Sequence, residues 1–216
     1  MKNESKSLSK IMLLGQIGSG KSTLGNKLVG KQVFNENLGP CSLHYTESAY
    51  GPNGIEIIDT NFREEDEKNN LIYNEMIKIK PNIIALIFYN ITRIDNRIKF
   101  MLENICKLSN TKSIWDHIII IFTHSHLFYL REEEEEEKRE EFVECFMSSL
   151  KEFLNKYYTN HKENDFPLNY NFKYYFVELS EKYYGHGEKE KEFQQETKNN
   201  LEAIMKLVKE MPPIIN

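Results

Sequence analysis

The segment from Gly15 to Ser22, which reads GQIGSGKS, restricts the possible folds more than any other part of the chain. It fits the pattern G-x-x-x-x-G-K-S/T, in which glycines let the backbone wrap closely around phosphate groups and point amide hydrogens at them. An apolar run, residues 10–14, comes directly before it, and an amphipathic run comes directly after it. Strand, glycine-rich loop and helix in this order predict a phosphate-binding loop (P-loop) that faces the positive end of the helix. The alternative is a glycine-rich turn with an incidental lysine.

The chemistry of phosphate binding assigns roles to the residues of this loop. Lys21 is expected to reach the β- and γ-phosphates of a nucleotide, and the Ser22 hydroxyl to bind Mg²⁺. Asp59 follows the apolar run 55–58, where an acid in P-loop proteins holds the metal ion through water. The alternative for Asp59 is a cap of a turn. The remaining loop residues are expected to form the phosphate cradle: Gly15, Gln16, Ile17, Gly18, Ser19, Gly20 and Thr23.

Short apolar runs separated by helical patterns indicate the fold. Runs 11–14, 83–89 and 117–123 are rich in Ile and Leu with little alternation, which is typical of parallel strands buried on both faces. Residues 43–50 and 55–58 flank a Gly-Pro-Asn-Gly turn and can form an antiparallel hairpin. A further strand is expected at 172–179, and helices at 21–30, 64–79, 95–108, 132–158 and 188–210. This order predicts an α/β three-layer P-loop NTPase sandwich, with a mostly parallel sheet and one antiparallel strand.

Composition narrows the class of protein. The 216 residues suit a single domain, and the formal net charge of −5 argues against nucleic acid as a partner. Three cysteines without a CxxC pair are typical of reduced intracellular thiols. Residues 1–9 lack the apolar core of a secretory signal, and no apolar run approaches the roughly 20 residues that span a bilayer. We therefore expect a cytoplasmic protein and leave open its peripheral association with the cytosolic face of a membrane.

One segment has a biased composition, because six glutamates occupy residues 132–137. Acidic residues favour the positive N-terminal end of a helix, so this run is interpreted as the solvated start of the helix expected at 132–158. The alternatives are an acidic docking surface and a weak cation site.

Three phrases together resemble a known family. The P-loop in the form G-x-x-G-x-G-K-S, the phrase Ile-Ile-Asp-Thr at 57–60 and the phrase Ile-Phe-Thr-His at 121–124 are similar to the AIG1/GIMAP group of guanine-nucleotide-binding proteins. That group is related to the plastid Toc GTPases and to septins. The resemblance covers about residues 8–185. It implies one AIG1-type G domain over residues 1–216, with the helix 188–210 at its C-terminus. It also implies that this domain binds GTP or GDP with Mg²⁺ and forms a homodimer through its nucleotide face.

The resemblance also marks two departures in the segments that sense the γ-phosphate. Residues 34–48 correspond to the first switch, and His44 stands where the family usually has a metal-binding threonine. Imidazole suits Mg²⁺ poorly, so Thr46 is the candidate for that ligand. The second switch usually begins Asp-Thr-Pro-Gly, whereas Phe62 replaces the glycine here. Weak sensing of the γ-phosphate is the expected consequence.

For the base, the resemblance implies a reader made of Thr123, His124 and the region of Glu178 and Ser180. The family's guanine-reading motif usually ends in Asp, and His126 stands in that region instead. Loss of the acid removes a charge-assisted discriminator against adenine, while His124 can stack on guanine or hydrogen-bond to it. The alternative for the two histidines is a pair of polar loop residues.

Arg93 lies in the phrase Thr-Arg-Ile at 92–94, where the family often has Gly-Arg-Phe or Gly-Arg-Tyr. The resemblance implies an arginine that acts across a dimer and neutralises charge on the transferring phosphoryl group. The alternative is an ordinary surface arginine at the start of a helix.

Three functional hypotheses follow. The leading one is a guanine-nucleotide switch that hydrolyses GTP slowly, with Lys21 and Arg93 as its catalytic residues and with nucleotide-dependent dimerisation. The second is a nucleotide-bound scaffold without hydrolysis, which His44 and Phe62 favour. The third is an ATP-dependent small-molecule kinase, although such kinases usually carry arginine-rich lids and this chain has few arginines.

Overall fold

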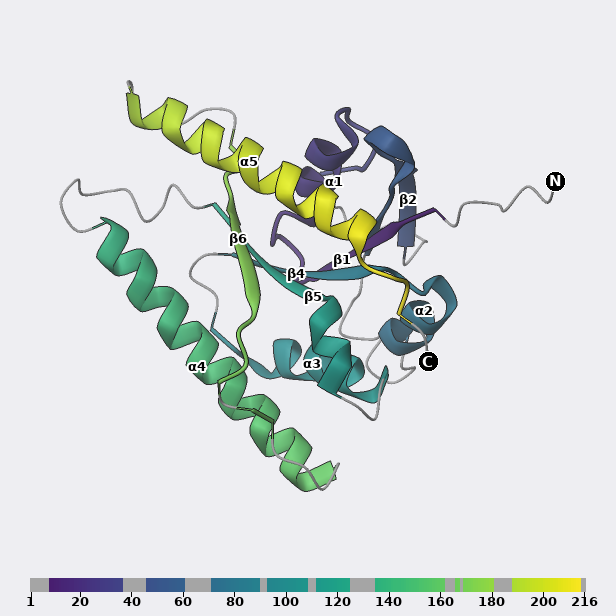
Figure 1. The fold of residues 1–216 in the computed structure, drawn as a ribbon, viewed down its shortest axis with the longest axis vertical. Helices are drawn as coiled ribbons and strands as arrows, with labels where there is room; N and C mark the ends of the chain where they lie inside the picture. The colour runs from purple at the N-terminus through teal and green to yellow at the C-terminus, as the bar shows by residue number, and fades with distance from the viewer. Residues whose placement is uncertain are drawn as a thin grey trace.

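A six-stranded sheet forms the middle layer of the computed structural model (Figure 1). The structure describes residues 8–36, 46–60, 71–89, 93–108, 112–124, 135–161, 166–167, 169–180 and 188–214. The strand order is β2-β3-β1-β4-β5-β6, and only the β2–β3 pair is antiparallel. The strands are β1 (Lys10–Gly15), β2 (Thr46–Tyr50), β3 (Glu56–Thr60), β4 (Ile83–Tyr89), β5 (Ile118–Thr123) and β6 (Lys173–Val177).

Helices cover both faces of this sheet. They are α1 (Lys21–Val29), α2 (Leu71–Ile79), α3 (Asn96–Leu108), α4 (Glu135–His161) and α5 (Glu188–Glu210), with short 3₁₀ turns at Pro52–Gly54 and Lys112–His117. Buried residues of α1 and α5 share one core with one side of the sheet, and those of α2, α3 and α4 share a second core with the other side. The described elements therefore form the three layers that the sequence predicts.

The central strands show why their sequences are apolar without alternation. Along β4, Ile84, Leu86 and Phe88 enter the core under α2, α3 and α4. The alternate residues Ile83, Ala85 and Ile87 enter the core under α1 and α5. Because successive side chains of a strand point to opposite faces, a strand covered on both sides must be apolar at every position.

The larger core contains a buried polar pair among its aromatic rings. Trp115 Nε1 donates a hydrogen bond of 2.9 Å to the Tyr158 hydroxyl, which links the turn before β5 to α4. Burial raises the pKa of Tyr158 to about 12. Phe166 and Phe172 each meet the indole ring edge to face, which is a favourable arrangement for aromatic pairs.

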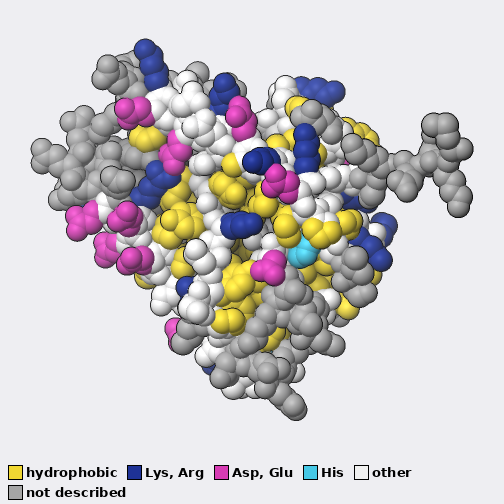
Figure 2. Space-filling model, viewed as in Figure 1, with side chains coloured by type: hydrophobic (Ala, Val, Ile, Leu, Met, Phe, Trp, Pro, Cys, Tyr) yellow, Lys and Arg dark blue, Asp and Glu magenta, His cyan; other side chains and the backbone are white. Residues whose placement is uncertain are grey.

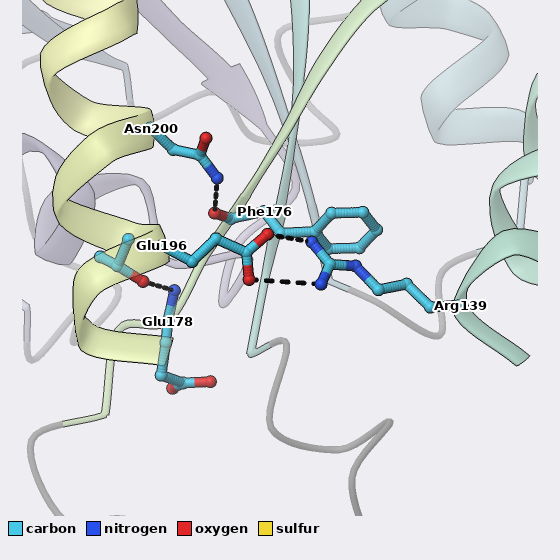
Figure 3. Close-up of polar contacts among 6 residues, drawn as sticks. Arg139, Phe176, Glu178, Glu196 and Asn200 are labelled. Carbon is cyan, nitrogen blue, oxygen red and sulfur yellow. Dashed lines mark hydrogen bonds and ion pairs between the residues drawn. The ribbon is translucent and has the colours of Figure 1, made fainter. Parts of the chain in front are cut away.

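At the edge of the sheet, side chains of α5 bond to the backbone of β6 and of the residue that follows it (Figure 3). Asn200 Nδ2 donates to the Phe176 carbonyl at 2.8 Å, and the Glu178 amide donates to Thr197 Oγ1 at 2.9 Å. Arg139 of α4 reaches Glu196 of α5 with two hydrogen bonds, and its guanidinium lies 3.6 Å from the centroid of the Phe176 ring. These contacts fasten α4 and α5 to the last strand.

The observed elements confirm the predicted fold class, including the antiparallel hairpin strand. The parts of the predicted helices at 64–70 and 132–134 lie outside the described residues. Helix α4 continues to His161, three residues past its predicted end, and the turn Lys112–His117 was not predicted.

Figure 2 shows acidic side chains gathered over the start of α4, and Glu137, Glu140 and Glu141 there are exposed. No described helix is both long and apolar enough to cross a bilayer.

Candidate functional site

The P-loop connects the end of β1 to the start of α1, near the middle of the sheet. Gly18 and Gly20 have φ angles of 82° and 89°, in the left-handed region that favours glycine. A Cβ atom on Gly20 would lie 2.3 Å from Leu179 Cδ1, and one on Gly15 would lie 2.3 Å from the Ile87 carbonyl oxygen. The loop therefore requires glycine both for its backbone shape and for its close packing.

Lys21 is the buried cation of this loop, with 4% of its surface exposed. Its Nζ donates a 2.8 Å hydrogen bond back to the Gln16 carbonyl, across the loop. Burial lowers the pKa of Lys21 from 10.5 to about 8, against a smaller opposing effect of the nearby Asp59 carboxylate. An ammonium group with little solvent around it is a strong partner for a phosphate oxygen.

Ser22 and Asp59 form a hydrogen-bonded pair of oxygen-bearing side chains beside Lys21. Ser22 Oγ donates to Asp59 Oδ2 at 2.6 Å, so the first turn of α1 meets the end of β3. Burial raises the pKa of Asp59, while the Ser22 hydrogen bond and the Lys21 charge act in the opposite direction. The second carboxylate oxygen, Oδ1, is buried without a hydrogen-bond partner. A hydroxyl and a carboxylate are ligands that Mg²⁺ prefers, and the unpartnered Oδ1 can accept from a metal-bound water, so this pair fits the predicted metal role.

Thr46, the third predicted metal ligand, is the first residue of β2. It lies opposite Thr60 in the antiparallel β2–β3 pair, next to the position where Glu47 lies opposite Asp59. This register places Thr46 at the same end of the sheet as the P-loop. His44 and Phe62, the two departures from the family's switch sequences, lie outside the described residues, and so does His126.

Thr123 and His124 bring the end of β5 to the P-loop. The Thr123 hydroxyl is fully buried and donates to the Ser19 carbonyl at 2.9 Å, with a longer contact of 3.3 Å to the Phe88 carbonyl. His124 has a φ of 57°, and its Nδ1 lies 3.1 Å from Thr123 Oγ1. Its ring packs 4.6 Å from the ring of Tyr89. Thr123 therefore holds the P-loop in place, while His124 is the residue of the pair that reaches the open site.

A cleft of about 420 Å³ joins these elements and is of the size that holds a small ligand. It extends from the P-loop to the residues after β5 and β6. Its lining residues are Gly18, Gly20, Lys21, Ser22, Thr23, Glu36, His124, Leu179 and Ser180.

The other predicted site residues lie around this cleft. Gln16, Ile17 and Ser19 line an adjacent hollow of about 190 Å³ against the end of β4. Gly15 lies at the base of the loop, at the end of β1. Glu178 is buried, and its carboxylate accepts from the Ser180 amide at 2.7 Å, so it shapes the turn that carries Leu179 and Ser180 into the cleft.

Arg93 is exposed just before α3, outside the lining of the cleft. The same stretch is tied to the P-loop by Asp95. Both Asp95 carboxylate oxygens lie 3.0 Å from Gln16 Nε2, and its amide donates to the Arg93 carbonyl at 2.9 Å. This contact puts Arg93 on the same side of the molecule as the P-loop.

Three residues around the site, Glu36, Leu179 and Asp95, could not be predicted from the sequence. An acid in a polar loop, a leucine after a strand and an aspartate before a helix are all common, so none of them carries a signal of its own. Their relation to the P-loop depends on contacts between segments far apart in the chain.

As to the acidic run, no cluster of three or more His, Cys, Asp or Glu residues suited to a metal ion was found in the part of the chain that the structure describes. Residues 132–134, where the run begins, lie outside the described residues.

Comparison with solved structures gives the same fold in other proteins. A dimerisation-deficient arginine-to-alanine mutant of Toc33 from Arabidopsis thaliana matches with a TM-score of 0.67 and 15% identity, over 96% of this chain and 87% of that chain. Toc33 from the same plant in complex with GDP and Mg²⁺ matches with a TM-score of 0.61 and 17% identity, over 93% and 84% of the two chains. A structure from work on dimerisation and the GTPase activity of the chloroplast translocon components atToc33 and psToc159 matches with a TM-score of 0.62 and 18% identity, over 93% and 82%. At this identity the likeness shows the fold.

Comparison with curated protein sequences gave no match. The family model described as AIG1 family matches residues 9–165, from the first strand through α4. This range contains the P-loop, Asp59 and the Thr123–His124 pair, which are the residues on which the resemblance rests. Because the match extends over more than half of the sequence, the chain belongs to the AIG1 family.

Proposed function

We propose that this protein is a guanine-nucleotide-binding G domain that holds GTP or GDP together with Mg²⁺. The observation that carries the proposal is the cleft itself, which joins the P-loop and Lys21 to His124 and the turn after β6. Phosphates fit the glycine-rich end, and a base fits between His124 and Leu179. The described Toc33 complex with GDP and Mg²⁺ supports the same ligands for this fold.

The residues around the cleft have distinct tasks in this proposal. The loop amides and Lys21 bind the phosphates, and Lys21 exchanges its bond to the Gln16 carbonyl for one to a phosphate oxygen. Ser22 would hold the metal ion directly and Asp59 through water. Mg²⁺ would supply positive charge that neutralises the β- and γ-phosphate oxygens. His124 would meet the base by stacking or by a hydrogen bond from its ring.

We further propose that the protein hydrolyses GTP slowly and that two copies associate through their nucleotide faces. The exposed Arg93, held near the P-loop through Asp95, would reach the phosphates of the partner copy. Support comes from the Toc33 work, in which dimerisation is described as important for GTPase activity and an arginine-to-alanine mutant as dimerisation-deficient.

Isothermal titration tests nucleotide binding. GDP, a non-hydrolysable GTP analogue, ADP and ATP are titrated into the full chain with Mg²⁺ present. We expect the guanine nucleotides to bind at least tenfold more tightly than the adenine nucleotides, and Lys21→Met to abolish binding. Lys27→Met, on the same helix and outside the cleft, is the matched control and should bind as wild type does. Equal affinity for GDP and ADP would contradict the guanine assignment.

Phosphate release and sedimentation test hydrolysis and association. Arg93→Ala should reduce both GTP turnover and analogue-dependent association, whereas Arg97→Ala, four residues further along and also exposed, serves as its control. If GTP binds but no phosphate is released at any protein concentration, the protein is a nucleotide-bound scaffold and not a hydrolase.

A further inference from the structure

Asn26 fastens the loop after α1 to that helix. Asn26 Oδ1 accepts from the amides of Val33 and Phe34, each at 2.8 Å. Asn26 Nδ2 donates to the Phe34 carbonyl at 2.9 Å. Because the carbonyl side of the amide receives two backbone donors, its orientation is determined by the contacts. The buried Phe34 ring packs against Gly25, where an added Cβ would lie 2.8 Å from the ring.

Glu36, two residues further on, is held by both of its carboxylate oxygens. Asn26 Nδ2 donates to Oε1 at 2.8 Å, and the Thr23 hydroxyl donates to Oε2 at 3.1 Å. Thr23 and Asn26 are three residues apart, so they lie on the same face of α1 and meet one carboxylate together. An ionised carboxylate offers about four acceptor positions, and these two bonds leave about two of them available.

The position of Glu36 in the cleft indicates what those acceptor positions face. The P-loop lines one part of the cleft and binds phosphates, and His124, Leu179 and Ser180 line the part assigned to the base. Glu36 belongs to neither group and is held by Thr23, the last of the P-loop residues that line the cleft. In a nucleotide the ribose is bonded directly to the phosphates, so a cleft residue held beside the phosphate cradle can meet the sugar.

The chemistry of this carboxylate agrees with a sugar partner. A negative charge close to the phosphate cradle is unfavourable for a polyanionic ligand unless the ligand offers it hydrogen-bond donors. A guanine nucleotide offers donors from the N1–H and amino groups of its base and from its ribose hydroxyls, and the ribose is the part that is bonded to the phosphates. Acidic residues recognise the ribose hydroxyls of dinucleotides in the same way in other α/β folds.

We propose that Glu36 accepts hydrogen bonds from the ribose hydroxyls of the bound nucleotide and makes the site selective for ribonucleotides over deoxyribonucleotides. This inference rests on the proposed function, because it assumes that the cleft holds a nucleotide. Glu36 is exposed at the cleft, and an analogue that lacks a ribose hydroxyl loses the bond to this carboxylate and therefore binds less tightly.

Titration calorimetry with unlabelled GDP, 2′-deoxy-GDP and 3′-deoxy-GDP tests the proposal in the presence of Mg²⁺. Unlabelled nucleotides are needed because a fluorescent group attached to the ribose would occupy the hydroxyls in question. We expect wild type to bind GDP about tenfold more tightly than at least one deoxy form, as for a hydrogen bond to a charged group. Glu36→Ala should bring the ratio of the two dissociation constants close to one, and Glu36→Gln should give an intermediate ratio. Glu202→Gln, an exposed glutamate of α5, is the control and should keep the wild-type ratio.

The outcomes separate this inference from the proposed function. If wild type binds GDP and both deoxy forms equally, or if Glu36→Ala keeps the preference, the role of Glu36 is wrong while nucleotide binding stands. If Glu36→Gln raises the affinity for GDP and for both deoxy forms by the same factor, the carboxylate acts only through its charge, and the proposal is also overturned. If no nucleotide binds, both proposals fail. A ribose preference together with equal affinity for GDP and ADP would support Glu36 and contradict only the guanine assignment.

Discussion

Replacing Lys21 with methionine should stabilise the nucleotide-free protein while it abolishes nucleotide binding. The ammonium group of Lys21 is buried in the P-loop, where its pKa falls from 10.5 to about 8. At about 1.4 kcal/mol per pH unit, this shift corresponds to about 3.5 kcal/mol that the folded state loses by keeping the lysine charged at pH 7. Methionine avoids that loss, but it also removes the charged hydrogen bond to the Gln16 carbonyl, which is worth about 1.5 kcal/mol. The expected net gain in the free energy of unfolding is about 2 kcal/mol at pH 7.

The gain should depend on pH with a defined sign. The unfolded chain binds this proton more tightly than the folded protein, so between pH 8 and 10.5 the unfolded state carries more protons. Raising the pH through this window therefore favours the folded wild type, and the advantage of Lys21→Met is greatest below pH 8. Above pH 8 the advantage should shrink by about 1.4 kcal/mol per pH unit and be nearly absent at pH 9.5.

Urea unfolding without nucleotide and with EDTA, followed by far-ultraviolet circular dichroism at pH 7 and pH 9.5, measures both effects. Lys27→Met on the same helix gives the background effect of exchanging a lysine for a methionine, and each difference is taken against wild type at the same pH. If Lys21→Met is less stable than wild type at pH 7, or if its gain is the same at both pH values, the argument from burial is refuted.

Three further substitutions test packing in the P-loop, at the edge of the sheet and in the larger core. Gly20→Ala should lower the free energy of urea unfolding by about 1–2 kcal/mol more than Gly30→Ala does. Both glycines have a positive φ, but only a Cβ on Gly20 would meet another side chain. Equal losses would contradict this argument. Arg139→Ala should lower the free energy of unfolding in urea by about 1 kcal/mol, and by less in 1 M salt, because its ion pair with Glu196 is partly exposed. A loss that does not change with salt would mean that only the contact with the Phe176 ring contributes. Trp115→Phe should lose about 1 kcal/mol or more in thermal unfolding, since the Tyr158 hydroxyl loses its buried donor; an unchanged melting temperature would show that another group replaces it.

Local sequence patterns were enough to predict the sheet. The run 83–89 is apolar at every position because β4 is covered on both faces, and the structure places the strand at these residues. The turn at 51–54 predicted the antiparallel pairing of β2 with β3, which the register confirms. In these cases the signal lies within a few neighbouring residues, so a single sequence contains it.

The P-loop could be predicted for a similar reason, because its glycines and lysine act through backbone shape and spacing. The role of Thr123 could not, since its hydroxyl bonds to the Ser19 carbonyl, 104 residues away in the chain. The Glu36 contacts with Asn26 likewise depend on how the loop after α1 folds back onto that helix. Contacts of this kind arise from the tertiary fold and leave no pattern in one sequence.

The hydrogen bonds that join α5 to β6 and to the turn after it make one side of the cleft and the position of that helix parts of one equilibrium. Thr197 bonds to the amide of Glu178, and the two residues that follow, Leu179 and Ser180, line the cleft. A molecule that binds α5 and draws it away from β6 must break this bond and disturb the turn that carries Leu179 and Ser180 into the cleft. The two binding equilibria are reciprocal. If such a molecule weakens the affinity for the nucleotide by some factor, the nucleotide weakens the affinity of that molecule for α5 by the same factor.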